Sequence, residues 1–213
     1  MKRLLFPLAT CALLAHGCTT SAPPAVALPS APVGMPDQVE KLVIAPDTPQ
    51  RAAQLPRTII DYDHALLTEN ERQVVAKLIE ASKQIDEIYW RQVSEDNPSM
   101  RVRLAAQASA QTATALDKAG YDYFLINKGP WDRLKEDEPF VGTARKPAGA
   151  AFYPADMTKA ELEQYIAAHP NKKDELEGLF TVVRRDGTDF VGVPYHAFYL
   201  DLLDPAARSE ELV

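Results

Sequence analysis

Apolar and polar residues alternate with helical spacing over one long segment in the first half of the chain. From Val74 to Val93 an apolar side chain recurs every three to four positions, which is typical of a helix with one buried face. Thr68 and Glu71 stand just before this segment and fit a capping box, in which each side chain bonds to the main-chain amide of the other. The pattern predicts a helix of about 25 residues, or about 37 Å at the usual rise per residue.

Three more helical segments are expected further along the chain. Residues 101–118 are rich in alanine, and Gly120 should end that helix because glycine readily adopts left-handed backbone. A second capping box begins at Thr158, and the helix that follows should end before Pro170. A shorter helix is expected at residues 172–179.

Strand composition is confined to a few short stretches. Residues 180–184 and 189–193 are rich in β-branched and aromatic side chains and flank Asp186-Gly187, which is a strong hairpin signal. Residues 58–62 also have strand composition. Because helical segments dominate, we expect an α+β fold that is helix-rich and contains a β-hairpin.

The last residues fit the start of one further helix. Asp204 is a good N-cap and Pro205 suits the first helical position. Only about two turns then remain before Val213, and an isolated helix of that length is marginal in water. We therefore expect residues 57–213 to form a truncated lobe with an exposed apolar surface.

The composition changes sharply between residues 19 and 56, which hold eight of the 17 prolines in the chain. Proline restricts the backbone and removes a hydrogen-bond donor, so such a segment predicts a solvated and semi-stiff tether. With a leader at residues 1–18, the expected organisation is leader, tether and a folded region over residues 57–213.

The leader has the pattern of a signal peptide. Two basic residues follow Met1, and the apolar stretch over residues 4–14 is too short to cross a bilayer, which needs about 20 apolar residues. Gly17-Cys18 resembles a bacterial lipobox, so Cys18 is the expected lipidation site. A chance cysteine in an ordinary cleaved leader is the alternative. The expected location is the bacterial cell envelope, lipid-anchored at the outer membrane and facing the periplasm.

Charge and cysteine content narrow the classes of partner. The formal net charge is -7, and the basic residues form no cluster that could face phosphates, which argues against nucleic acid. The two cysteines, Cys11 and Cys18, lie in the leader and at its end, so none would be left for a disulfide or a cysteine-based metal site. The sequence also lacks a Gly-rich phosphate loop and a G-x-S-x-G nucleophile turn.

Three sequence blocks point to a known family. They lie at residues 126–134, 138–140 and 149–159, and in this order they resemble the bacterial and plant members of the dipeptidyl peptidase III family. The resemblance covers about residues 57–207, the N-terminal portion of such a protein. It implies part of a two-lobed zinc metallopeptidase that removes dipeptides from the N-termini of peptides.

The zinc chemistry of that family needs an H-E-x-x-x-H helix, which this sequence lacks. The four histidines are followed by Gly17, Ala65, Pro170 and Ala197, so no His-Glu pair is present. No catalytic or metal-binding residue can therefore be assigned. Zinc is expected only in a full-length family member, and this chain is expected to be inactive alone.

The stretch from residue 127 to residue 153 has no periodicity and carries several aromatic residues and an adjacent Asp and Arg that we expect to form a buried pair. Long irregular segments inside a domain are often functional, and we take Asn127, Trp131 and Tyr153 as candidate substrate-binding residues in the wall of a peptide cleft. The alternative is a structural Ω-loop that its aromatic side chains hold in place.

Two function classes remain open. The first is the N-terminal part of a dipeptidyl peptidase III-like exopeptidase, with peptides or the missing C-terminal region as partners. The second is a stand-alone envelope lipoprotein that acts as a binding or structural module, with the membrane as its partner through the lipid.

Overall fold

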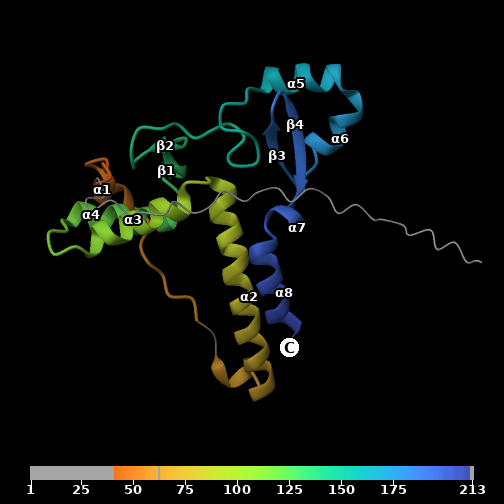
Figure 1. The fold of residues 1–213 in the computed structure, drawn as a ribbon. Helices are drawn as coiled ribbons and strands as arrows, with labels where there is room; N and C mark the ends of the chain where they lie inside the picture. The colour runs from red at the N-terminus through yellow and green to blue at the C-terminus, as the bar shows by residue number, and fades with distance from the viewer. Residues whose placement is uncertain (1–40, 62, 212–213) are drawn as a thin grey trace, which may run out of the picture. The chain divides into compact units, whose positions relative to one another are not determined.

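The computed structural model describes residues 41–61 and 63–211, which are helix-rich with two small antiparallel sheets (Figure 1). The helices are α1 (Thr48–Ala52), α2 (Glu69–Val93), α3 (Asn97–Ser109), α4 (Ala115–Asn127), α5 (Lys159–Ala168), α6 (Lys173–Leu176), α7 (Tyr195–Phe198) and α8 (Leu200–Glu211). Single 3₁₀ turns occur at His64–Leu66, Arg133–Lys135 and Pro170–Lys172. The strands are β1 (Trp131–Asp132), β2 (Glu138–Pro139), β3 (Thr181–Asp186) and β4 (Asp189–Pro194). The expected α+β, helix-rich fold with a β-hairpin is confirmed.

Helix α2 starts and ends where the sequence predicted. The Thr68 hydroxyl oxygen accepts a bond from the Glu71 amide at 3.4 Å, and Glu71 Oε2 accepts one from the Thr68 amide at 2.7 Å. The capping box therefore satisfies amides that the first turn leaves unbonded. Helix α8 lies along α2, and Ile88 of α2 belongs to a buried cluster with Val182 and Tyr199 (Figure 1).

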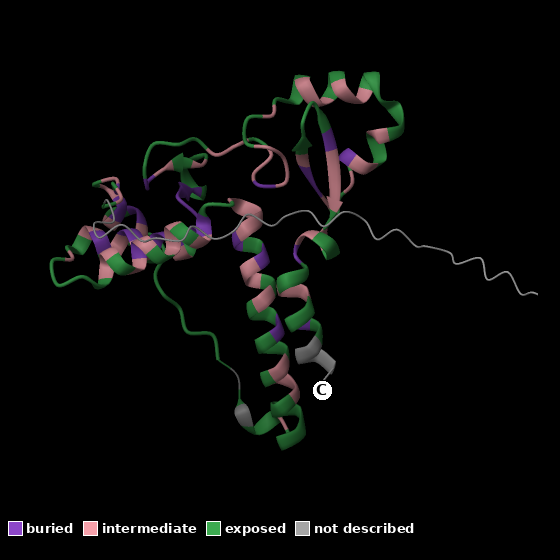
Figure 2. Ribbon diagram, viewed as in Figure 1, coloured by how far each residue is buried: buried purple, intermediate pink, exposed green. Residues whose placement is uncertain are grey.

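The single buried face expected for α2 is only partly formed. Ala81, Ile88 and Trp90 are buried, but most other positions of the helix are exposed or intermediate (Figure 2). The apolar pattern predicted the helix correctly and overestimated its burial.

The helix expected to end at Gly120 is in fact two helices, and Gly120 lies inside the second. The break follows α3, and Thr114 and Asp117 form a capping box that starts α4. Gly120 is needed for close packing, because a Cβ there would lie 2.5 Å from Ile44 Cδ1. The left-handed C-cap of α4 is Lys128, with φ of 57°.

The predicted tether is too long, because its last part is folded. Ile44 is buried and forms a β-bridge with Val141, and α1 packs against α4. We call residues 41–55 the strap. Its partners lie far away in the sequence, so its proline-rich composition did not reveal them. The predicted leader, Cys18 and the tether up to residue 40 lie outside the described residues.

The strand expected at residues 58–62 does not form over residues 58–61. Ile59 and Ile60 are 85% and 94% exposed, and no strand pairs with them among the described residues. β-branched composition favours a strand only where a neighbouring strand and a buried face are available.

The hairpin of the second half is confirmed. Strands β3 and β4 pair in antiparallel register from Thr181 with Pro194 to Asp186 with Asp189, and Gly187 in the turn has φ of 60°. Helix α5 begins at Lys159 with Thr158 as its N-cap, as expected, and it packs on a cluster of Leu176, Val183 and Phe190.

The last helix begins earlier than expected. Helix α8 starts at Leu200, so Asp204 is not its N-cap and Pro205 lies inside it. Proline there removes the bond to the Asp201 carbonyl and its ring crowds that carbonyl, but packing along α2 supports the helix. Within the described part of the chain, no helix is both long and apolar enough to cross a membrane.

Candidate functional site

The loop predicted to carry the site folds around a minimal hairpin. Strand β1 pairs with β2 through Trp131 with Pro139 and Asp132 with Glu138. The Trp131 indole is buried, and its Nε1 donates to the carbonyl of Ala144 at 2.8 Å. This bond ties the hairpin to the loop that follows it.

Asn127, the last residue of α4, is also bonded to the main chain, once within α4 and once in the segment that follows it. Its Nδ2 donates to the carbonyl of Tyr123 at 3.0 Å, and its Oδ1 accepts from the amide of Arg133 at 3.1 Å. Asn127 is therefore bonded to the main chain directly after β1, and its amide group positions the chain after α4.

Tyr153 lies apart from these two residues. It packs against the cluster around Leu176, and its hydroxyl donates to the Leu176 carbonyl at 2.9 Å. Burial, and then the nearby Glu177 carboxylate, raise the pKa of Tyr153. All three predicted residues have polar groups bonded to main-chain atoms, so each has a scaffold role, and direct substrate contact stays a prediction.

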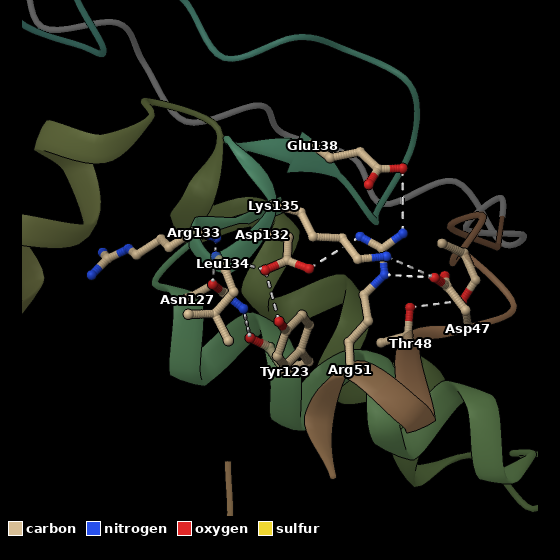
Figure 3. A network of polar contacts seen from close by, with 11 residues as sticks. Asp47, Thr48, Arg51, Tyr123, Asn127, Asp132, Arg133, Leu134, Lys135 and Glu138 are labelled. Carbon is tan, nitrogen blue, oxygen red and sulfur yellow. Dashed lines mark hydrogen bonds and ion pairs between the residues drawn. The ribbon is translucent and has the colours of Figure 1, made fainter. Parts of the chain in front are cut away.

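A charge network centred on the buried Arg51 and Asp132 adjoins the hairpin (Figure 3). Only 5% of the Arg51 side chain is exposed, and three carboxylates surround it. Arg51 Nε donates to Asp47 Oδ2 at 2.9 Å, Nη1 to Asp132 Oδ2 at 3.1 Å, and Nη2 to Glu138 Oε1 at 3.3 Å. Burial alone would lower the pKa of Arg51, but bonds to Asp47, Glu138 and Asp132 raise it above its ordinary value, so the guanidinium stays charged.

Asp132 is the point where the network joins the helices. Besides Arg51, its carboxylate accepts bonds from the Tyr123 hydroxyl at 2.8 Å and from the Leu134 amide at 2.9 Å. Burial, and then the bond to Asp132, raise the pKa of Tyr123, so this hydroxyl stays protonated and donating. The network thus fixes the strap, α4 and β1 in one arrangement.

An open depression adjoins this network. Its volume is about 670 Å³, and it is bounded by the β1–β2 turn and by the loop at residues 145–148. Lys146 pairs with Asp137 at 3.0 Å across it. Glu136 and Asp137 both have left-handed backbone, with φ of 52° and 60°. Such strain in non-glycine residues often occurs at functional sites, so this charged depression is the candidate binding surface.

The described residues do not fit a zinc centre. They contain no group of three or more His, Cys, Asp or Glu residues that could hold a metal ion. His169 stacks on Tyr165, with its Nδ1 3.0 Å from the Tyr165 carbonyl oxygen, and His196 is exposed. We therefore derive no metal-dependent step from these residues.

Sequence reasoning missed the partner of Asp132. The adjacent Asp and Arg of this loop were expected to form a buried pair, but the Arg133 guanidinium instead donates to the Tyr89 hydroxyl at 2.7 Å. The partner of Asp132 is Arg51, 81 positions earlier in the sequence. No local pattern could have identified it.

Comparison with solved structures identifies the relationship. DPP III from Caldithrix abyssi matches with a TM-score of 0.70 and 40% sequence identity, over 76% of this chain and 30% of that chain. This chain is dipeptidyl peptidase III-like. The family resemblance inferred from the three sequence blocks is thereby confirmed, and the chain is related to a peptidase.

One curated protein and the family models complete the comparison. Nudix hydrolase 3 from Arabidopsis thaliana is 32% identical over 192 aligned residues, which cover 67% of this chain and 24% of the plant protein. No family model matches the sequence. The name of the plant protein differs from that of DPP III, and the DPP III match has the higher identity and coverage of this chain. The chain spans less than a third of either protein.

Proposed function

We propose that this chain forms the part of a dipeptidyl peptidase III-like, zinc-dependent exopeptidase that lies outside the metal centre, and that it is inactive alone. The observation that carries the proposal is the match to DPP III, with 40% identity and a TM-score of 0.70 over 76% of the chain. The zinc ligands and the general base would come from the remainder of such a fold, because the sequence holds no His-Glu pair.

In this proposal the described residues bind and position the peptide. The depression beside the β1–β2 turn offers carboxylates and cations, including Glu136 and Arg145, at the rim of a rigid hairpin. The Arg51 network holds that hairpin from behind. Asn127 and Trp131 bond to main-chain atoms around the hairpin, Tyr153 bonds at the Leu176 cluster, and direct contact of these three residues with the peptide stays part of the proposal.

The test measures zinc and dipeptide release on the purified chain. We expect no stoichiometric zinc after dialysis and no release from dipeptidyl arylamide substrates. DPP III from Caldithrix abyssi, assayed beside it, is the control for the method. About one zinc per chain, together with dipeptide release, would show that the chain contains a complete site and that the proposal is wrong.

We also propose that the protein is anchored in the bacterial envelope through a lipid on Cys18. The support is the basic and apolar leader pattern and the Gly17-Cys18 junction. Cys18→Ser should abolish incorporation of a labelled fatty acid, whereas Cys11→Ser, which changes the other cysteine, should not. Equal labelling of the two variants, or soluble wild-type protein without label, contradicts the proposal.

The leader pattern also favours a second candidate function, a stand-alone envelope lipoprotein that acts as a binding or structural module. The two candidate functions predict different thermal stabilities for the chain alone. A cooperative thermal transition above about 60 °C, in the range of well-formed mesophile domains, without binding of a hydrophobic dye, would favour the module. An open reading frame with H-E-x-x-x-H directly downstream would favour the peptidase.

A further inference from the structure

The segment that follows the strap is exposed along its whole length. Every residue from 53 to 61 is exposed (Figure 2), and residues 56–60 belong to no helix, strand or turn. Among the described residues, the main-chain hydrogen bonds stop at the Leu55 amide and resume at the Leu66 amide. We call residues 56–61 the linker, and its backbone is open to a partner that binds extended chain.

The linker has the sequence of a substrate for an endoprotease that cuts after arginine. Such enzymes bind extended chain, whereas hydrogen-bonded backbone must open before it can be cut. Arg57 is exposed, as are Pro56 before it and Thr58 after it. Pro56 has a fixed φ and keeps the residue before it out of the helical region. The Arg57 side chain matches the acidic specificity pocket of trypsin-like proteases.

Basic residues on either side of the linker are less accessible, because their backbone is bonded or their side chain is buried. The Arg72 side chain is 44% exposed, but its amide forms a helical bond of 3.0 Å in α2. The Leu42 amide, directly after Lys41, donates to the Gln107 side chain at 2.8 Å. Arg51 is buried. Exposed side chain and open backbone therefore coincide at Arg57.

The strap is held in place by contacts that do not involve the linker. The Ala45 amide donates to the Phe140 carbonyl at 2.8 Å, and the Gly142 amide donates to the Val43 carbonyl at 2.9 Å. The ion pairs of Arg51 to the β1–β2 hairpin add to these bonds. All of these contacts can persist when the chain is cut in the linker.

We infer that the Arg57–Thr58 bond is a processing site for an arginine-specific endoprotease, and that the strap holds the two products together afterwards. The protease adds water across this peptide bond, which leaves a carboxylate on Arg57 and an ammonium group on Thr58. Residues 58–213 then remain attached to the N-terminal product only through the noncovalent contacts of the strap. Dissociation of the strap, rather than the cut itself, releases them. The processing site is independent of the proposed function.

Limited digestion of the purified full chain with trypsin tests the site, with the products identified by intact mass. Within residues 41–211 we expect the first cut after Arg57, at least about tenfold faster than after Arg72, since cutting in α2 needs local opening. Arg57→Gln should lose this first product, and the matched variant Arg72→Gln should keep it. A first cut in α2, or in the strap after Lys41 or Arg51, overturns the proposal.

Size-exclusion chromatography of the cut protein tests the hold of the strap. The two wild-type products should elute together in native buffer and apart in urea. Gly120→Ala places a Cβ 2.5 Å from Ile44 Cδ1, so Ile44 must move, while alanine suits helix α4 better than glycine does. After the cut, the N-terminal product should separate from Gly120→Ala but stay with Lys118→Ala, an exposed position of the same helix. Separate elution of the wild-type products directly after the cut overturns the proposal, whatever the variants do.

Discussion

Two regions of this molecule are held together in different ways. The strap, α4 and the β1–β2 hairpin meet around Arg51, whose ion pairs to Asp132 and Glu138 join residues 81 and 87 positions apart. The region formed by α5, α6, β3 and β4 closes around an apolar cluster of Leu176, Val183 and Phe190, with polar contacts such as those of Glu175 and Tyr153, which span 17 and 23 positions. The first region has an apolar cluster, which includes Ile44, Phe124 and Phe140, and in addition a buried cation with ion pairs to distant segments. The second region has an apolar cluster and polar contacts between segments that lie closer together in the sequence.

The largest expected effect comes from removing that cation. Arg51→Ala leaves the Asp132 carboxylate buried without its counter-charge, which should lower the free energy of unfolding by about 3–5 kcal/mol. Urea denaturation measures it. Arg91→Ala is the matched control, because it breaks an exposed pair with Asp201 and should cost at most about 1 kcal/mol. Equal losses for both variants would show that the buried Arg51 contributes no more to stability than an exposed ion pair does.

A smaller loss is expected from crowding the second region. A Cβ added at Gly192 would lie 2.7 Å from the main-chain oxygen of Glu175, so Gly192→Ala must shift strand β4 or α6. Overpacking of this kind costs about 1–3 kcal/mol. Hydrogen exchange should show loss of protection in β3 and β4 but not in the strap. Thr188→Ala, in the exposed turn of the same hairpin, is the control and should change stability by less than about 0.5 kcal/mol. Loss of protection in the strap would mean that the regions unfold as one.

Loss of the N-cap of α4 should weaken the first region moderately. The Thr114 hydroxyl accepts a bond from the Asp117 amide at 3.2 Å, and removing such a cap costs about 1 kcal/mol. Thr114→Ala should therefore lower the urea midpoint, while Thr112→Ala, an exposed threonine two positions earlier, should leave it unchanged. If Thr114→Ala and Thr112→Ala have the same urea midpoint, then packing of Gly120 against Ile44, and not the N-cap, determines where α4 starts.

Acid should weaken the first region more than the second. Burial would raise the pKa of Asp117, but bonds from Thr114, Gln107 and Lys41 outweigh it and hold the pKa well below the ordinary value of 3.8. The unfolded chain then binds the proton more readily. The contribution of Asp117 to the free energy of unfolding is fully present above pH 3.8, and it is lost as the pH falls below that value towards the lower pKa of the folded state.

The variants Asp117→Asn and Glu175→Gln test this acid dependence. The bond from Lys172 lowers the pKa of Glu175 in the same direction, but the Glu175 side chain is 34% exposed, so its effect should be smaller. The urea midpoint of the wild type should fall between neutral pH and acid. This fall should be reduced more by Asp117→Asn than by Glu175→Gln. The reverse order would contradict the comparison.

The candidate site could be predicted only in part. The block around Trp131 and Asp132 was identified as a distinctive irregular segment, and its aromatic side chains do hold it in place. The ion-pair partner of Asp132 was not identified, because Arg51 lies in a proline-rich segment with no helical periodicity. The capping box of Thr114 and Asp117 was not identified, because one continuous helix was expected there, and Gly120 was assigned as the end of that helix rather than as a site of close contact with Ile44.

What the sequence by itself determined were the features encoded within a few residues of one another. The capping box and length of α2, the start of α5 and the β3–β4 hairpin follow from bonds and turns that neighbouring residues make on their own. Tertiary structure decided the folding of the strap, the burial of Arg51 and the exposure of apolar residues of α2 such as Leu78 and Ile85. Those outcomes depend on which distant surface meets a given segment, and an apolar or charged residue carries no local record of its partner.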